Sequence, residues 1–71
     1  MDYTVIYEET PKGFSAYLPD LPGCIAAGAT RAETERLIGS AVAMHLEAMR
    51  EDGEPLPSPS TSAGTVRVAS G

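Results

Sequence analysis

A single long stretch of helix-forming residues, 31–52, dominates this chain and limits what the rest can form. It opens with TRAE, a T-x-x-E capping box in which the Thr30 hydroxyl accepts a hydrogen bond from the Glu33 amide. Gly53 and Pro55 end it, because glycine favours the position after a helix and proline cannot continue one. At 100° per residue the apolar side chains share one stripe, which predicts an amphipathic helix of about six turns. The stripe consists of Ile38, Ala41, Val42, His45 and Met49.

The residues before the helix predict three strands. Residues 2–9 are rich in β-branched and aromatic residues, and residues 14–18 form a second strand with Phe14, Ala16 and Leu18 on one side. The turn sequence TPKG joins the two as an antiparallel hairpin. Residues 24–29 are a weaker third strand, in which Gly28 indicates a bulge or the close approach of another backbone. Gly39 costs the helix about 1 kcal/mol relative to alanine, and a close helix–sheet contact would explain it.

The segment PDLPG connects the second and third strands and has a structural interpretation. Pro19 and Pro22 have no N–H to donate to a sheet, so the segment is a connection. Asp20 can accept from a backbone amide two residues on, in an Asx-turn. Gly23 supplies a positive φ before the third strand, and Cys24 is a small strand residue.

The end of the chain predicts a connector, followed by a possible fourth strand, for which a frayed tail is the alternative. Residues 54–64 are rich in proline and serine and favour an extended connector, whereas 65–69 alternate β-branched and polar residues. We expect a core of residues 1–59 and a tail of 60–71. The fold class is then α+β, a two-layer β-β-β-α-β unit with one long helix on a small, mostly antiparallel sheet, whose last strand is parallel to the first.

Composition narrows the class of function. The chain of 71 residues is one domain with a small core and one cysteine, so it has no internal disulfide and a homodimer or higher homo-oligomer is expected. Its net charge of −5 repels phosphate backbones, so free nucleic acid is a poor partner and a basic protein surface a better one. Acidity that only aids solubility is the alternative. Without an apolar segment for a membrane span or signal peptide, we expect a cytoplasmic protein.

Catalytic and metal chemistry find little support. Cys24 and His45, the only residues of their types, form a cysteine–histidine pair only if the helix packs on the sheet, and no third orienting group is evident. The alternative is a small buried cysteine and a histidine in or beside the core. One cysteine and one histidine do not close a zinc site. We expect that the chain is not an enzyme and that it binds no cofactor or metal.

Two separated motifs resemble the HicB-like family. These are GFSAYLPDLPGCIAAGAT, which runs into the capped helix, and the phrase EDGEPLP at 51–57, in which the helix ends. The resemblance covers roughly residues 3–60. It implies a truncated RNase H-like sheet with one helix. It also implies an antitoxin that binds and covers HicA, a small basic toxin that cleaves messenger RNA.

Fuller members of that family carry a C-terminal DNA-binding domain. Only eleven residues follow Ser60 here, so no direct nucleic-acid binding is expected from this chain alone. The alternative to an antitoxin is an orphan homo-oligomeric domain with a structural or regulatory role and no toxin partner.

Candidate contacts with a cationic partner are acidic and aromatic side chains. The acids lie on the outer face and ends of the helix, where a solvated face is the competing interpretation, and the tyrosines lie on the sheet, where the protomer's own core or a homodimer face competes. The candidates are Glu33, Glu47, Glu51, Asp52, Tyr3, Tyr7 and Tyr17.

Overall fold

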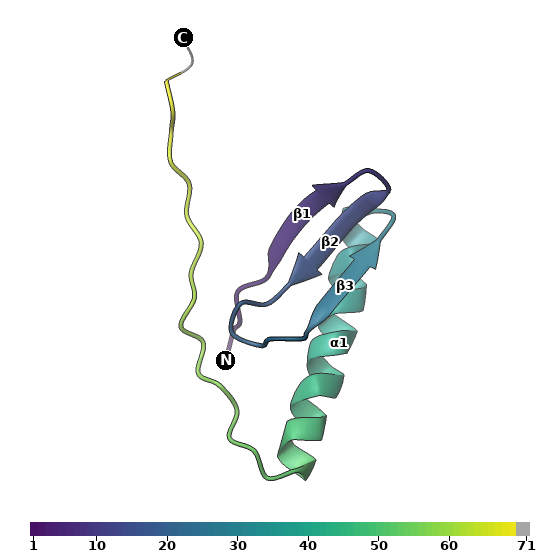
Figure 1. Ribbon diagram of the computed structural model, residues 1–71, viewed down its shortest axis with the longest axis vertical. Coiled ribbons are helices and arrows are strands. Elements are labelled where there is room, and N and C mark those ends of the chain that lie inside the picture. Colours follow the sequence, from purple (N-terminus) through teal and green to yellow (C-terminus); the bar gives the residue numbers. More distant parts are fainter. Residues whose placement is uncertain (70–71) are drawn as a thin grey trace.

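The computed structural model describes residues 1–69, in which three strands and one helix form two layers (Figure 1). The strands β1 (Ile6–Thr10), β2 (Gly13–Tyr17) and β3 (Ile25–Gly28) form one antiparallel sheet in the order β1-β2-β3. The helix α1 (Arg31–Glu51) lies on one face of this sheet and packs against β2 and β3. The expected α+β class is confirmed, with three strands in the described residues.

The hairpin of β1 and β2 closes over a turn of two residues. Thr10 pairs with Gly13, and the Lys12 amide donates to the Thr10 hydroxyl at 3.3 Å. Gly13 has a φ of 151°, and a Cβ there would collide with the Gly28 carbonyl oxygen. Glycine at this position therefore serves both the turn and the close approach of the end of β3.

The segment PDLPG forms two consecutive β-turns, each with proline at its second position. The Leu21 amide donates to the Leu18 carbonyl at 3.1 Å, and the Cys24 amide donates to the Leu21 carbonyl at 3.1 Å. Gly23 takes the third position of the second turn with a φ of 89°, which is typical of a type II turn. The predicted connection is confirmed.

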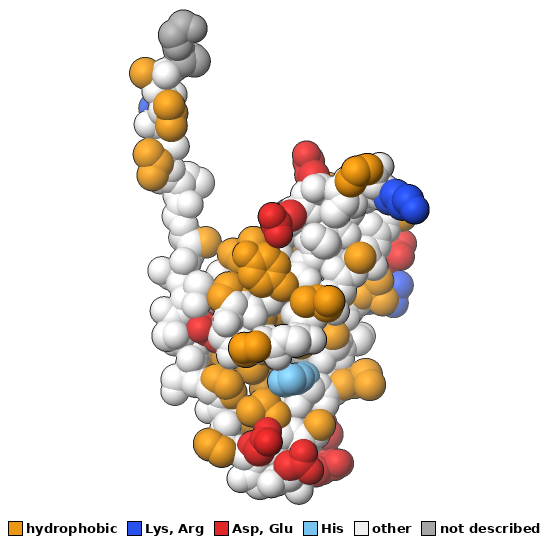
Figure 2. Space-filling view, in the orientation of Figure 1, with side chains coloured by type: hydrophobic (Ala, Val, Ile, Leu, Met, Phe, Trp, Pro, Cys, Tyr) orange, Lys and Arg blue, Asp and Glu red, His pale blue; other side chains and the backbone are white. Residues whose placement is uncertain are grey.

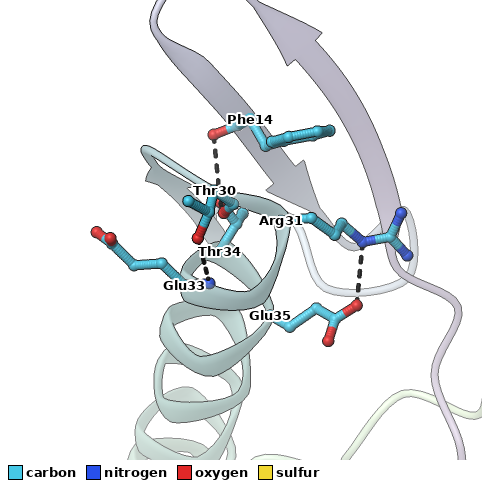
Figure 3. A network of polar contacts seen from close by, with 6 residues as sticks. All are labelled: Phe14, Thr30, Arg31, Glu33, Thr34 and Glu35. Atoms are coloured by element: carbon cyan, nitrogen blue, oxygen red, sulfur yellow. Dashed lines mark hydrogen bonds and ion pairs between the residues drawn. The ribbon is translucent and has the colours of Figure 1, made fainter.

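Side-chain and backbone bonds fix the start of α1 (Figure 3). The Glu33 amide donates to the Thr30 hydroxyl at 3.1 Å, so the predicted N-cap is confirmed. The Thr34 hydroxyl donates to the Thr30 carbonyl at 2.8 Å. Arg31 and Glu35 form an ion pair one turn apart at 3.1 Å. This pair contributes little to the stability of the helix, because both side chains are about half exposed.

The end of α1 is a Schellman motif. Gly53 has a φ of 71°, its amide donates to the Arg50 carbonyl at 3.1 Å, and the Glu54 amide donates to the Met49 carbonyl at 2.9 Å. The glycine stop predicted from the sequence is confirmed. Because Asp52 is the C-cap, the helix ends one residue before the predicted boundary.

The core lies between the helix and the β2–β3 half of the sheet. Half-buried side chains of the predicted helical stripe pack around it, and Met44, which flanks that stripe, is 74% exposed. Thr34 is fully buried, which the stripe did not predict. The buried apolar residues are Ala16, Leu18, Leu21, Cys24 and Ile38.

Two glycines in regular elements have opposite surroundings. A Cβ at Gly28 would lie 3.1 Å from the Thr34 backbone nitrogen and 2.8 Å from the Thr34 hydroxyl oxygen, so the predicted close approach of another backbone is confirmed at this position. A Cβ at Gly39 would meet nothing within 4 Å outside its own helix. The close helix–sheet contact predicted for Gly39 is therefore wrong, because that side of the helix faces open space.

The strand boundaries shift for reasons that the turns explain. The first strand starts at Ile6 rather than at residue 2, because β2 ends opposite it at Tyr17 and the Leu18 carbonyl then bonds within the turn. The third strand starts one residue later than predicted, because the Cys24 amide is also used in a turn. It ends at Gly28, one residue before the predicted end.

The fourth strand predicted at 65–69 does not form in the described part of the chain. Residues 54–69 have no regular secondary structure, and Val66 and Val68 are 86% and 80% exposed. Alternating β-branched residues favour a strand only where a partner strand accepts them, and 65–69 pairs with none. The division between residues 59 and 60 stays a prediction, and residues 70 and 71 of the tail lie outside the described residues.

We predict that Gly28→Ala lowers the free energy of unfolding by about 1–3 kcal/mol, because the new methyl group meets the buried Thr34 side chain. Urea unfolding monitored by circular dichroism measures this loss. A stability equal to that of the unsubstituted chain would show that Thr34 moves aside at no cost.

We predict that Gly39→Ala raises the free energy of unfolding by up to about 1 kcal/mol. Alanine restricts the backbone of the unfolded chain, and in the folded chain its methyl group meets no neighbour. The same urea titration measures it, and Gly28→Ala is the matched control for the effect of adding one methyl group. A loss of stability would mean that the Gly39 face is packed in solution.

Candidate functional site

Cys24 is a core residue. Its side chain is 3% exposed, and burial raises the pKa of its thiol, which disfavours the reactive thiolate. His45 lies half-buried on α1. In residues 1–69, no three His, Cys, Asp or Glu side chains gather as a metal site requires. The surroundings of the PDLPG-Cys segment thus indicate a structural role and give no support to a catalytic or metal-binding role.

Asp20 has a different role from the one predicted. An Asx-turn to the residue two positions on is impossible, because that residue is Pro22 and has no N–H. Its Oδ2 instead accepts from the amides of Ser60 and Thr61 at 3.0 and 3.1 Å. Its Oδ1 accepts from their hydroxyls at 3.0 and 2.8 Å. Asp20 therefore binds a segment forty residues away.

These four bonds stabilise the ionised carboxylate. The backbone bond from Thr61 is the largest cause, followed by its hydroxyl and by Ser60, and together they hold the pKa of Asp20 below its ordinary value of 3.8. The carboxylate of Asp20 is therefore charged, and acts only as an acceptor, at neutral pH.

A second set of bonds holds the same segment against the residues that precede β1. The Thr4 hydroxyl donates to the Thr61 carbonyl at 2.6 Å, and the Tyr3 hydroxyl donates to the Pro57 carbonyl. We call residues 56–69 the C-terminal arm. Its first part lies beside residues 3–4, and Figure 1 shows the rest extending away from the sheet and helix.

The three candidate tyrosines do not converge on one surface. Tyr7 faces the helix side of the sheet, where the Arg31 guanidinium lies 3.7 Å from its ring centroid in a cation–π contact. Tyr3 is half-buried under the arm. Tyr17 is 39% exposed on the opposite face of the sheet, opposite Ile25. Tyr17 is the most exposed of the three side chains.

The face that carries Tyr17 is apolar. Ile25 is 71% exposed there, and Figure 2 shows hydrophobic side chains gathered over the middle of the molecule in this view. A shallow hollow of 540 Å³ lies over β2 and β3, and sequence reasoning missed it because it depends on strand register. The residues that line it are Ser15, Ala16, Tyr17, Ile25, Ala26 and Ala27.

The four candidate acids fall into two places. Glu33 lies in the first turn of α1, half-buried beside Gly28. Glu47, Glu51 and Asp52 are exposed near the end of the helix, and Figure 2 shows acidic side chains gathered there. The two places are roughly 20–30 Å apart at 1.5 Å per helical residue. Arg50 lies 3.8 Å from Glu47, an exposed pair of little energetic weight.

Comparison with known proteins identifies the family. Residues 3–68 match the family model described as HicB_like antitoxin of bacterial toxin-antitoxin system. The chain belongs to this family. The match extends over the C-terminal arm, so Ser60 and Thr61 lie within the HicB-like unit.

Solved structures agree with the HicB-like assignment. A chain of the HicA3 and HicB3 toxin-antitoxin complex is 40% identical with a TM-score of 0.70, over 84% of this chain and 70% of that one. The antitoxin HicB3 crystal structure gives the same identity and TM-score over 84% of this chain and 44% of that one.

A viral protein is similar over most of the HicB-like unit. An uncharacterized 14.9 kDa protein in the rep-hol intergenic region of Haemophilus phage HP1 (strain HP1c1) is 39% identical over 57 residues. That alignment covers 80% of this chain and 43% of the phage protein. The chain thus spans less than half the length of this relative and of the crystallised HicB3 chain.

We predict that Cys24 of the folded chain reacts with a disulfide reagent about two orders of magnitude more slowly than in the urea-unfolded chain, because the thiol is buried. Absorbance of the released thiolate measures both rates. His45→Gln is the control and leaves the folded rate unchanged. A much slower reaction in His45→Gln would show that the imidazole activates the thiol.

Proposed function

We propose that this chain is a HicB-like antitoxin module that binds a small basic HicA-type toxin and covers its active site. The observation that carries the proposal is the 40% identity, at a TM-score of 0.70, with a chain of the HicA3 and HicB3 toxin-antitoxin complex. Membership of the antitoxin family over residues 3–68 supports it.

We infer that the chain acts by binding rather than by catalysis. The buried Cys24 thiol has a raised pKa, which is unfavourable for a nucleophile.

No helix in the described residues is long and apolar enough to cross a bilayer. The cytoplasm as the site of action and the absence of direct nucleic-acid binding are parts of the same proposal. A sheet related to RNase H is also part of it.

The exposed acids near the end of α1 are the proposed contact for cationic toxin residues. Carboxylates at a helix C-terminus oppose the helix dipole, at a typical cost of about 0.3–1 kcal/mol each. Apart from the weak pair of Glu47 with Arg50, helix stability therefore gives no reason for Glu47, Glu51 and Asp52 to be acidic, whereas a basic partner does. Tyr17 is the tyrosine whose exposed ring suits a contact, since Tyr3 and Tyr7 are engaged within the chain.

An orphan homo-oligomeric domain is the second candidate. The exposed Ile25 and Tyr17 on the outer face of the sheet favour it, because a second copy would bury them. This candidate requires a stable oligomer of the purified chain without any toxin.

Binding to a HicA-type toxin tests the proposal directly. The purified chain is titrated into such a toxin in a calorimeter, and cleavage of a labelled messenger RNA by the toxin is followed at the same ratios. We expect binding with loss of cleavage as the chain approaches equimolar amounts. The toxins to assay are HicA-type toxins encoded beside close relatives of this chain. Undiminished messenger RNA cleavage by these toxins at a large excess of the chain would refute the antitoxin role.

We predict that Glu47→Lys with Glu51→Lys weakens toxin binding on the order of tenfold, because it replaces attraction to a basic surface by repulsion. Glu8→Lys with Glu9→Lys, at exposed positions of β1, is the matched control with the same charge change. Lysine near a helix C-terminus favours the helix dipole, so unfolding will not explain the loss. Equal affinities for the two double variants would place the toxin contact elsewhere.

A further inference from the structure

The carboxylate of Asp20 is saturated by two consecutive residues. Ser60 and Thr61 each donate one amide and one hydroxyl, so each carboxylate oxygen accepts two bonds, all between 2.8 and 3.1 Å. A residue without a side-chain hydroxyl at either position would supply only its amide. The arrangement is therefore a binding site with a chemical preference for a pair of hydroxyl-bearing residues.

The attachment of the arm is mainly polar. Leu56, Pro57 and Thr61 are half-buried, whereas residues 58–60 and 62–69 are exposed. No strand pairing holds any part of the arm in the described residues. The bonds that Asp20 accepts, together with those that Tyr3 and Thr4 donate, are thus the specific contacts that fix its path.

The turns place the carboxylate where the arm passes. Asp20 is the third residue of the first β-turn of PDLPG, and the backbone bonds of both turns are made without its side chain. The side chain is consequently free to project from the corner toward the arm. The backbone of this short segment thus forms the turns, and the side chain of Asp20 binds the arm.

We propose that Asp20 is a clip for the Ser60–Thr61 pair that positions the C-terminal arm and sets the direction in which residues 62–69 leave the two-layer unit. The ligand is a hydroxyl-bearing dipeptide of the same chain, recognised through both of its amides and both of its hydroxyls. Opening the clip frees the arm and leaves the sheet and helix folded. The clip does not rest on the toxin proposal.

Nuclear magnetic resonance of the full, isotopically labelled chain tests the clip. Asp20→Asn replaces one acceptor oxygen by a donor amide that faces the donors of Ser60 and Thr61. Ser60→Ala with Thr61→Val removes the hydroxyl donors and leaves the PDLPG corner unchanged. Glu9→Gln, at an exposed position on β1, is the control for the loss of one charge.

Both clip variants should lose the nuclear Overhauser contacts between residues 3–4 and 57–61. Amide exchange at residues 60 and 61 should rise about tenfold or more, with exchange in β2 and α1 unchanged. Glu9→Gln should keep every arm contact. If Ser60→Ala with Thr61→Val retains the arm contacts and slow exchange, the clip is refuted even where Asp20→Asn disturbs the corner. The readout needs no toxin, so this result is separate from the fate of the antitoxin proposal.

Discussion

The close contact between the first turn of α1 and the end of β3 is the constraint on which the rest of the structure depends. Thr34 is fully buried there, and its hydroxyl oxygen lies where a side chain on Gly28 would have to be. That contact fixes how deeply the helix sits on the sheet. Ile38, one turn further on, then reaches the cluster that the sheet and the PDLPG corner supply. A core this small tolerates little displacement of its single helix, because each buried side chain is a large share of the whole.

The sequence could predict the elements whose causes are local. The cap at Thr30, the stop at Gly53 and the turn at Gly23 each follow from the conformational preferences of a few adjacent residues, and all three are confirmed. The ends of the strands were less accurate, because they depend on which amides the neighbouring turns consume. Gly39 was misread for a related reason, since a glycine gives no sign of whether its missing side chain faces a neighbour or open space.

Contacts between distant segments lay beyond such reasoning. The sequence places Asp20 in a turn of its own corner, but Pro22, two residues on, has no N–H to donate to it. Nothing local pairs it with Ser60 and Thr61, and a Ser-Thr pair in a proline-rich segment is also typical of a plain linker. The tyrosines show the same limit. Their type predicts contact area, but strand register and the arm decide that Tyr3, Tyr7 and Tyr17 lie in three different surroundings.

The segment from Pro19 to Thr30 serves the fold of the chain. The prolines shape the two turns, Cys24 fills the core, Thr30 begins the helix, and Asp20 binds the arm. Of these side chains only that of Cys24 is buried, and Pro19, Pro22 and Thr30 remain exposed. A surface kept for a partner is best sought where the fold does not require the side chains present. In the described residues, the acidic end of α1 and the apolar outer face of the sheet meet that condition. They differ in chemistry: the acidic end suits a basic protein, and the apolar face suits a surface without charge.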